Sequence, residues 1–169
     1  MERLNPQPAA DERTVLDEYL DYHRATLLLK SDGLDKLGLN ARPAPSELTL
    51  GGLLKHLAYV EDFWIQVRFL GLPNPEPWAS APFDEDPDWE LHSAVDDDPA
   101  DLRALYVAAC ERSRQAVAEV PLDQLSVGLD REGRQWNLRR ILVHLIEETA
   151  RHNGHADFLR EAIDGTVGD

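Results

Sequence analysis

The stretch "LRRILVHLIEETARHNGHADFLREAI", residues 138–163, decides the fold class. Its apolar residues recur at spacings of three and four, which is the period of an amphipathic helix. Asn137 precedes the stretch as a typical N-cap, and Gly165 follows it as a typical helix stop. We therefore predict a helix that begins after Asn137 and ends near Gly165.

Three earlier segments show the same period, and no segment shows the alternation of a strand. They cover residues 11–32, 50–71 and 98–120, with Gly33 after the first, Thr49 before the second and Asp98 and Pro99 opening the third. Helices of this size are roughly 33 to 40 Å long at 1.5 Å per residue, the scale of a four-helix bundle. The sequence predicts an all-α protein with a single four-helix bundle domain over residues 1–169.

The connection between the second and third predicted helices is the longest in the chain. It reads "LPNPEPWASAPFDEDPDWELHSAVDD", residues 72–97, and is rich in proline and acidic residues. Connections of this length cross over a bundle, form a lid or are disordered. Trp78 and Trp89 favour a crossover that packs against the helices, since tryptophan side chains gain most from burial.

The composition excludes several classes of function. The chain has 32 acidic and 17 basic residues and a formal net charge of -15, so its field repels nucleic acids and anionic membranes. It contains no uncharged apolar run of membrane-spanning length, and its N-terminal residues lack the pattern of a signal peptide. We expect a cytoplasmic protein that binds a small-molecule substrate. We expect its one cysteine, Cys110, to be a buried, inert thiol.

Ionisable side chains occupy the apolar face of the last predicted helix. Glu148 and His152 are four residues apart, which places their Cβ atoms roughly 5 to 6 Å from each other on one face. A buried carboxylate needs a partner for its charge, and a divalent metal ion is one such partner. The second helix offers His56 beside its inward face, at a similar height if the two helices are antiparallel. That face comprises Leu53, Leu57, Val60, Phe63, Trp64 and Val67.

We therefore predict a metal site formed by His56, Glu148 and His152, with a position left for water or substrate. Two other interpretations remain open at this point. His56 alone is typical of a hydrogen-bonded core histidine, and Glu148 with His152 could be a hydrogen-bonded pair, buried or exposed. The other histidines have separate expectations: His155 as an alternative ligand or a group beside the ligands, His23 in the core, His144 outside the apolar face and His92 on the surface.

The chain contains the pattern H-L-x-x-V-E-x-x-W at residues 56–64 and the pattern E-x-x-x-H-x-G-H at residues 148–155. The two patterns resemble the DinB-like superfamily, in the branch that includes the N-terminal domain of mycothiol-dependent maleylpyruvate isomerase. The resemblance spans almost the whole chain. It implies an up-down-down-up bundle in which the second and third helices are parallel, and this topology requires the long crossover between them.

The resemblance also implies a divalent metal ion, zinc or nickel among others, held by His56, Glu148 and His152. Members of the superfamily most often carry histidine where this chain has Glu148, and glutamate there is similar to the isomerase branch. A homodimer is implied as well. Gly154 matches the family pattern, and because glycine costs roughly 1 kcal/mol within a helix, we expect another helix to pack closely against it.

The implied function is a metal-dependent S-transferase that uses a low-molecular-weight thiol such as mycothiol or bacillithiol. A metal-dependent hydrolase could use the same three ligands. A third alternative is a non-catalytic, stress-related binding or dimerisation module with a structural ion. The isomerase has an additional C-terminal domain, so we do not expect maleylpyruvate isomerisation from this chain.

Overall fold

The computed structural model describes residues 2–168, and these residues form helices and no strand. The predicted all-α class is confirmed. Two short helices, α2 and α4, were not predicted, because four residues are too few to show a helical period. The elements are α1 Glu12–Ser31, α2 Lys36–Leu39, α3 Leu50–Asp62, the π-helix η1 Phe63–Phe69, α4 Trp89–His92, the 3-10 helix η2 Ser93–Val95, α5 Pro99–Val117 and α6 Leu138–Asp164.

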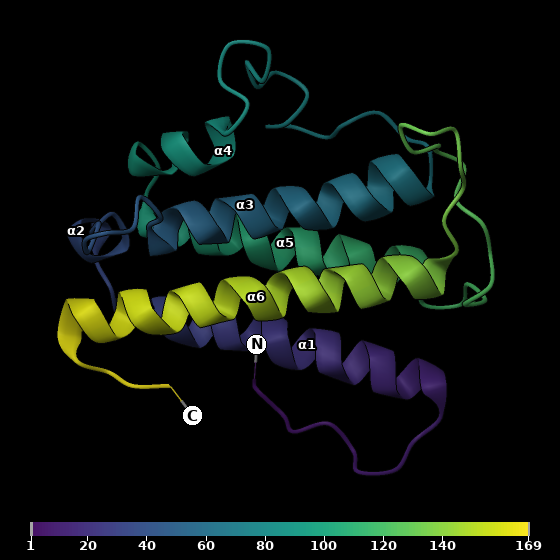
Figure 1. Ribbon diagram of the computed structural model, residues 1–169, viewed down its shortest axis with the longest axis horizontal. Coiled ribbons are helices and arrows are strands. Elements are labelled where there is room, and N and C mark those ends of the chain that lie inside the picture. Colours follow the sequence, from purple (N-terminus) through teal and green to yellow (C-terminus); the bar gives the residue numbers. More distant parts are fainter. Residues whose placement is uncertain (1, 169) are drawn as a thin grey trace.

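The four long helices lie side by side, with α1 packed on α6 and α3 packed on α5 (Figure 1). In the same view, α3 and α5 run in one direction, and α1 and α6 run in the other. Their facing sides are lined by fully buried leucines, among them Leu27, Leu53 and Leu145. Burial of such side chains is worth about 1.5 to 3 kcal/mol each, so these contacts supply most of the force that holds the helices together.

The helix ends follow the predicted start and stop residues closely. Asp11 and Asn137 accept hydrogen bonds from backbone N–H groups at the starts of α1 and α6. Gly165 ends α6 with φ at 79°, a left-handed conformation that suits glycine. Helix α5 ends at Val117, whereas the sequence predicted that this helix would end near residue 120.

The helix predicted over residues 50–71 is α-helical only in its first part, α3. The α-helix ends at Asp62, and the next residues form the π-helix η1, whose Leu70 N–H donates to the Ile65 carbonyl at 3.0 Å. A π turn holds more residues than an α turn, so the inward face shifts along the sequence. Ile65 and Phe69 are therefore buried, whereas the predicted Phe63, Trp64 and Val67 are half-buried.

The long connection is ordered and packs against α3, as its tryptophans predicted. Trp78 is 1% exposed, and its indole N–H donates to a carboxylate oxygen of Asp62 at 2.8 Å. The ring also contacts that of Tyr59, with centroids 5.3 Å apart. The connection runs back along α3 and reaches α4 on the side of α3 away from α6 (Figure 1). It thereby brings α4 to the first turns of α3.

A buried ion pair joins α1 to α3. Two guanidinium nitrogens of Arg24 donate to the two carboxylate oxygens of Glu61, each at 2.7 Å. Arg24 is 3% exposed and Glu61 is 2% exposed. The Sγ atom of Cys110 lies 4.0 Å from this carboxylate. Burial and the charge of Glu61 raise the pKa of Cys110 to about 12, so the thiol stays protonated at neutral pH, as expected for an inert cysteine.

The expectation for Gly154 is wrong. A Cβ atom at this position would meet nothing within 4 Å among the described residues, so no helix packs closely against it. Gly154 lies on the exposed side of α6. Close packing therefore does not account for the glycine.

Replacing Gly154 by alanine is expected to stabilise the protein by about 1 kcal/mol, because alanine loses less backbone entropy in a helix and has room for its methyl group. For a chain of this size, that corresponds to a rise of roughly 2 to 4 °C in Tm. Thermal unfolding followed by circular dichroism measures the change. A lower Tm would show that the position is constrained by something other than helix propensity.

Candidate metal centre

The structure brings together the three side chains that the sequence predicted as metal ligands. His56 lies on α3, while Glu148 and His152 lie one turn apart on α6. One ligand atom from each residue can be chosen so that all three lie within 4.8 Å of one another. The side chains are 19%, 23% and 13% exposed in that order, so the cluster is mostly buried and remains accessible from outside.

Two separations within the cluster are close to those between the ligands of a small divalent ion. His56 Nε2 lies 3.6 Å from Glu148 Oε1, and His152 Nε2 lies 3.2 Å from the same oxygen. Two ligand atoms at about 2.1 Å from a tetrahedral ion are about 3.4 Å apart. The two distances to Glu148 Oε1 lie on either side of this value, while the three ligand atoms lie within 4.8 Å of one another. Three protein ligands would leave a fourth position for an exogenous molecule.

A second carboxylate holds the His56 ring in the orientation that a metal ligand needs. His56 Nδ1 donates to Glu90 Oε1 on α4 at 2.8 Å. His56 Nε2 is buried and has no hydrogen-bond partner among the residues that the structure describes. A carboxylate that fixes one ring nitrogen while the other remains open is typical of metal-binding histidines. The buried Nε2 atom of His56, which faces Glu148 without a hydrogen bond, is therefore the feature that best matches a bound ion.

The local sequence explains how Glu90 reaches His56. A Cβ atom on Gly52, one turn before His56, would lie 3.1 Å from the Leu91 carbonyl, so glycine permits α4 to approach α3 closely. Lys55 secures the same contact, since its Nζ lies 4.5 Å from the centre of the Trp89 ring. Sequence reasoning missed Glu90. The adjacent glycines at the start of the helix were the available signal for a close backbone approach.

The ionisable groups of the cluster shift the pKa values of one another. Burial alone would lower the pKa of His56, but its interactions with Glu148 and Glu90 outweigh burial and raise that pKa to about 9. The interaction with His56 lowers the pKa of Glu148 to about 2, against the effect of burial. Burial and the charge of His56 lower the pKa of His152. Cation binding requires a neutral imidazole, so it would displace a proton from His56 at neutral pH.

Of the four remaining histidines, His155 and His92 lie where the sequence predicted them, whereas His144 and His23 are both half-buried. His155 lies beside the cluster, with its Nδ1 atom 3.4 Å from His152 Nδ1. His144 packs on the ring of Trp64, with ring centroids 4.4 Å apart. His23 is half-buried and its backbone carbonyl accepts a hydrogen bond from Asn153. His92 is exposed and pairs with Asp86.

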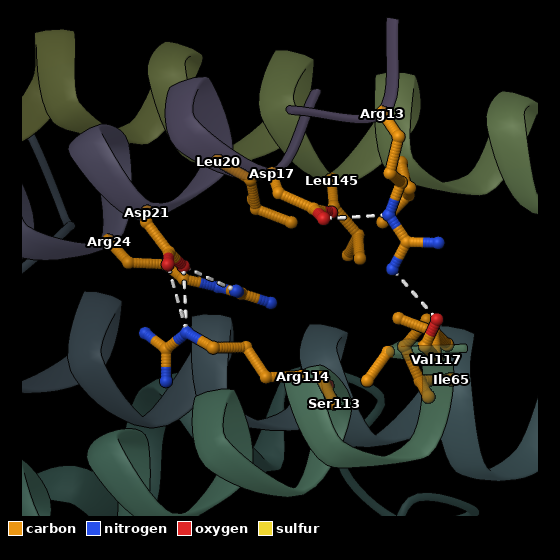
Figure 2. Close-up of a pocket in the computed structure, with 12 residues that line it drawn as sticks. Arg13, Asp17, Leu20, Asp21, Arg24, Ile65, Ser113, Arg114, Val117 and Leu145 are labelled. Atoms are coloured by element: carbon orange, nitrogen blue, oxygen red, sulfur yellow. Dashed lines mark hydrogen bonds and ion pairs between the residues drawn. The ribbon is translucent and has the colours of Figure 1, made fainter. Parts of the chain in front are cut away.

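A separate cavity of about 300 Å³ lies between α1 and α5 and includes none of the three candidate ligands (Figure 2). Its polar wall consists of ion pairs within the protein, including Arg114 with Asp21 at 3.0 Å. Arg13 donates to Asp17 and to the carbonyls of Val117 and Val120. The arginines thus bridge two helices that have little other contact, and we assign this cavity a structural role.

The family model described as mycothiol S-transferase matches residues 15–165, which is most of the chain. The protein belongs to the mycothiol S-transferase family. The resemblance to the DinB-like branch that the sequence suggested is therefore confirmed. No curated protein matches this family member.

Two solved structures are similar to this mycothiol S-transferase family member in fold. A conserved protein from Enterococcus faecalis has 18% sequence identity and a TM-score of 0.67, over 94% of this chain and 100% of that one. The mycothiol-dependent maleylpyruvate isomerase has 15% identity and a TM-score of 0.58, over 90% of this chain and 60% of the isomerase. No helix within residues 2–168 of the family member is long and apolar enough to cross a membrane.

Replacing Glu90 by glutamine is expected to weaken zinc binding by about 10- to 100-fold, because the amide retains the shape of the side chain but removes the charge that supports His56. Competition with a coloured chelator measures the affinity. The matched control is Glu85→Gln, on an exposed residue of the same connection. Equal zinc affinity in both variants would show that Glu90 does not support a metal ligand.

Proposed function

We propose that this protein is a metal-dependent S-transferase that joins a low-molecular-weight thiol, such as mycothiol or bacillithiol, to an electrophilic small molecule. Membership in the mycothiol S-transferase family supports the thiol chemistry. The observation that carries the proposal is the cluster of His56, Glu148 and His152, in which the buried Nε2 of His56 faces Glu148 at 3.6 Å without a hydrogen-bond partner among the described residues.

The candidate ligands suit zinc or nickel, since two imidazoles and one carboxylate are ligands that both ions accept. A bound divalent ion supplies a Lewis acid that lowers the pKa of a thiol at the open position. Glu148 contributes one negative charge, so the three ligands leave a divalent site with a net charge of about +1. Glu90 keeps Nδ1 of His56 protonated and directs Nε2 toward the other two ligands.

The proposed transfer is a substitution or addition at carbon. In the substitution, the sulfur–carbon bond forms while the bond from that carbon to the leaving group breaks. The leaving group departs with the electron pair, and the thiol proton goes to solvent. The reaction needs no external oxidant or reductant, so the thiol and the electrophile are its only reactants.

The test is an assay of zinc-loaded and nickel-loaded protein with an activated aryl chloride and with mycothiol, bacillithiol or no thiol. A thiol-dependent increase in thioether formation above the uncatalysed rate is expected. Breakdown of an ester or amide substrate without thiol would instead identify the hydrolase alternative. Metal binding without either activity would favour the non-catalytic binding or dimerisation module.

Several finer features belong to the same proposal. We propose that residues 1–169 form a single DinB-like domain with the up-down-down-up bundle topology, which the helix directions in Figure 1 support. The homodimer and the cytoplasmic location stay predictions. Light scattering coupled to size-exclusion chromatography measures the oligomeric state.

A further inference from the structure

An apolar pocket lies beside the candidate metal centre, at the end of α6. Its volume is about 390 Å³, within the range of small-molecule sites. The only polar side chains among its lining residues are Ser46 and His155. One wall is the segment before α3, and the other is the last turns of α6. The lining residues are Pro43, Ala44, Pro45, Ser46, His155, Phe158, Leu159 and Ala162.

Phe158 indicates that this pocket suits an apolar ligand. The side chain is 77% exposed, although it is a large aromatic ring on an otherwise well-packed helix. A ring left in water forgoes the favourable free energy of burial. A flat, apolar ligand in the pocket would cover part of this ring and recover some of that free energy.

The side chain of His155 connects the pocket to His152, one of the candidate metal ligands. His155 lines the pocket, and its ring centroid lies 5.3 Å from that of His152. The two Nδ1 atoms are 3.4 Å apart, at hydrogen-bonding distance. A molecule that extends from the pocket past His155 would approach a reactant at the metal centre, and a reaction between two bound molecules requires such an approach.

The Nδ1 atoms of His152 and His155 face each other at hydrogen-bonding distance, so Nε2 of His155 takes no part in this contact. An imidazole nitrogen can donate a hydrogen bond to an oxygen of a ligand. His155, which lines the pocket, therefore offers a polar contact to a ligand bound there.

We propose that this pocket binds the electrophilic substrate, with its apolar body between Phe158 and the Pro43–Ser46 segment and with a hydrogen-bond acceptor directed to His155. The inference rests on the proposed function and specifies the class of its substrate: an electrophile with an apolar body the size of an aromatic ring and a nitro or carbonyl oxygen near the reacting carbon. The thiol cosubstrate is polar, and an apolar lining does not suit it.

The reaction with 1-chloro-2,4-dinitrobenzene illustrates the chemistry that this site would accommodate. The thiol sulfur bonds to the chlorine-bearing carbon, the C–Cl bond breaks and chloride leaves with the electron pair. The thiol proton is released to solvent. Negative charge builds up on the nitro oxygens as the sulfur adds, so the His155 N–H would bind the reacting state more strongly than the free substrate.

The first test fills the pocket. Ala162→Phe places a ring in it from an exposed helical position, and Ala108→Phe makes the same change at an exposed position of α5, which does not line the pocket. We expect the Ala162 variant to raise KM for the aryl chloride by about tenfold, because the substrate ring then loses part of the favourable free energy of its burial. KM for the thiol and zinc content should stay unchanged, and the Ala108 variant should resemble the wild type.

The second test separates the hydrogen bond of His155 from its packing. His155→Leu removes the donor and should lower kcat/KM for the aryl chloride by about 3- to 10-fold. His155→Gln retains an N–H donor and should recover most of that loss. A purely structural role would give both variants the same activity, and this result would overturn the assignment of His155.

Binding of 1,3-dinitrobenzene, which has no leaving group, distinguishes this inference from the proposed function. Ligand-observed NMR should detect binding to the wild type and the Ala108 variant but not to the Ala162 variant. This result, without any transferase activity, would support the pocket and contradict the proposed function. Transferase activity in the wild type, together with an unchanged KM for the aryl chloride in the Ala162 variant, would support the proposed function and contradict the assignment of the pocket.

Discussion

Zinc bound to the His152→Ala variant is expected to fall from about one ion per chain to little or none. His152 supplies one of three candidate ligands, and its Nε2 atom lies 3.2 Å from Glu148 Oε1. Loss of an outer partner of a ligand weakens metal affinity by about 10- to 100-fold, and loss of a ligand itself should cost at least as much. Elemental analysis of zinc-loaded, dialysed protein measures the ion content, and the thioether assay should fall in parallel.

His92→Ala is the matched control for this experiment. His92 is exposed on the long connection and pairs with Asp86, outside the cluster. The same chemical change there should leave the zinc content as in the wild type. Equal zinc in the His152 variant and the wild type would remove the proposed metal site and, with it, the chemistry of the proposed transferase.

Replacing Glu61 by leucine is expected to lower the free energy of unfolding by about 3 to 5 kcal/mol, since it leaves the guanidinium of Arg24 buried without its main partner. Arg24 retains one hydrogen bond to Asp21, which favours the lower end of this range. Urea unfolding followed by circular dichroism measures the difference. If the variant lost less than about 1 kcal/mol, the pair would be as weak as a surface salt bridge.

Two further variants show whether the loss comes from the unpaired charge. The double variant Arg24→Leu with Glu61→Leu removes both charges and should regain much of the stability, because apolar side chains can replace a buried pair at little cost. Glu12→Gln breaks the exposed pair with Arg139 and should change stability little. A double variant as unstable as the single one would indicate that lost packing is the cause.

The sequence was sufficient to predict the long helices and the three members of the cluster. Helical periodicity and capping residues such as Asn137 are local signals, and they are visible without knowledge of the partners of a helix. The spacing of Glu148 and His152 fixes their common face in the same way. Placing His56 beside them required only that α3 and α6 run in opposite directions, which Figure 1 shows.

The features that sequence reasoning missed depend on contacts between distant segments. Glu90 is one acidic residue among many in the long connection, and only the approach of α4 to Gly52 distinguishes it. The charge of Glu61 gives no indication of its burial, because the partner that justifies burial lies on another helix. For Gly154, the family pattern suggested close packing, but the structure leaves its surroundings open.

The π-helix after Asp62 has a consequence for aligning this chain with its relatives. A π turn inside an α-helix corresponds to one inserted residue. A relative whose helix is regular throughout should therefore align with a single-residue gap within Phe63–Phe69. An ungapped alignment would match Trp64 and Arg68 to the core positions that Ile65 and Phe69 occupy here, while the register at His56, earlier in the helix, would remain correct.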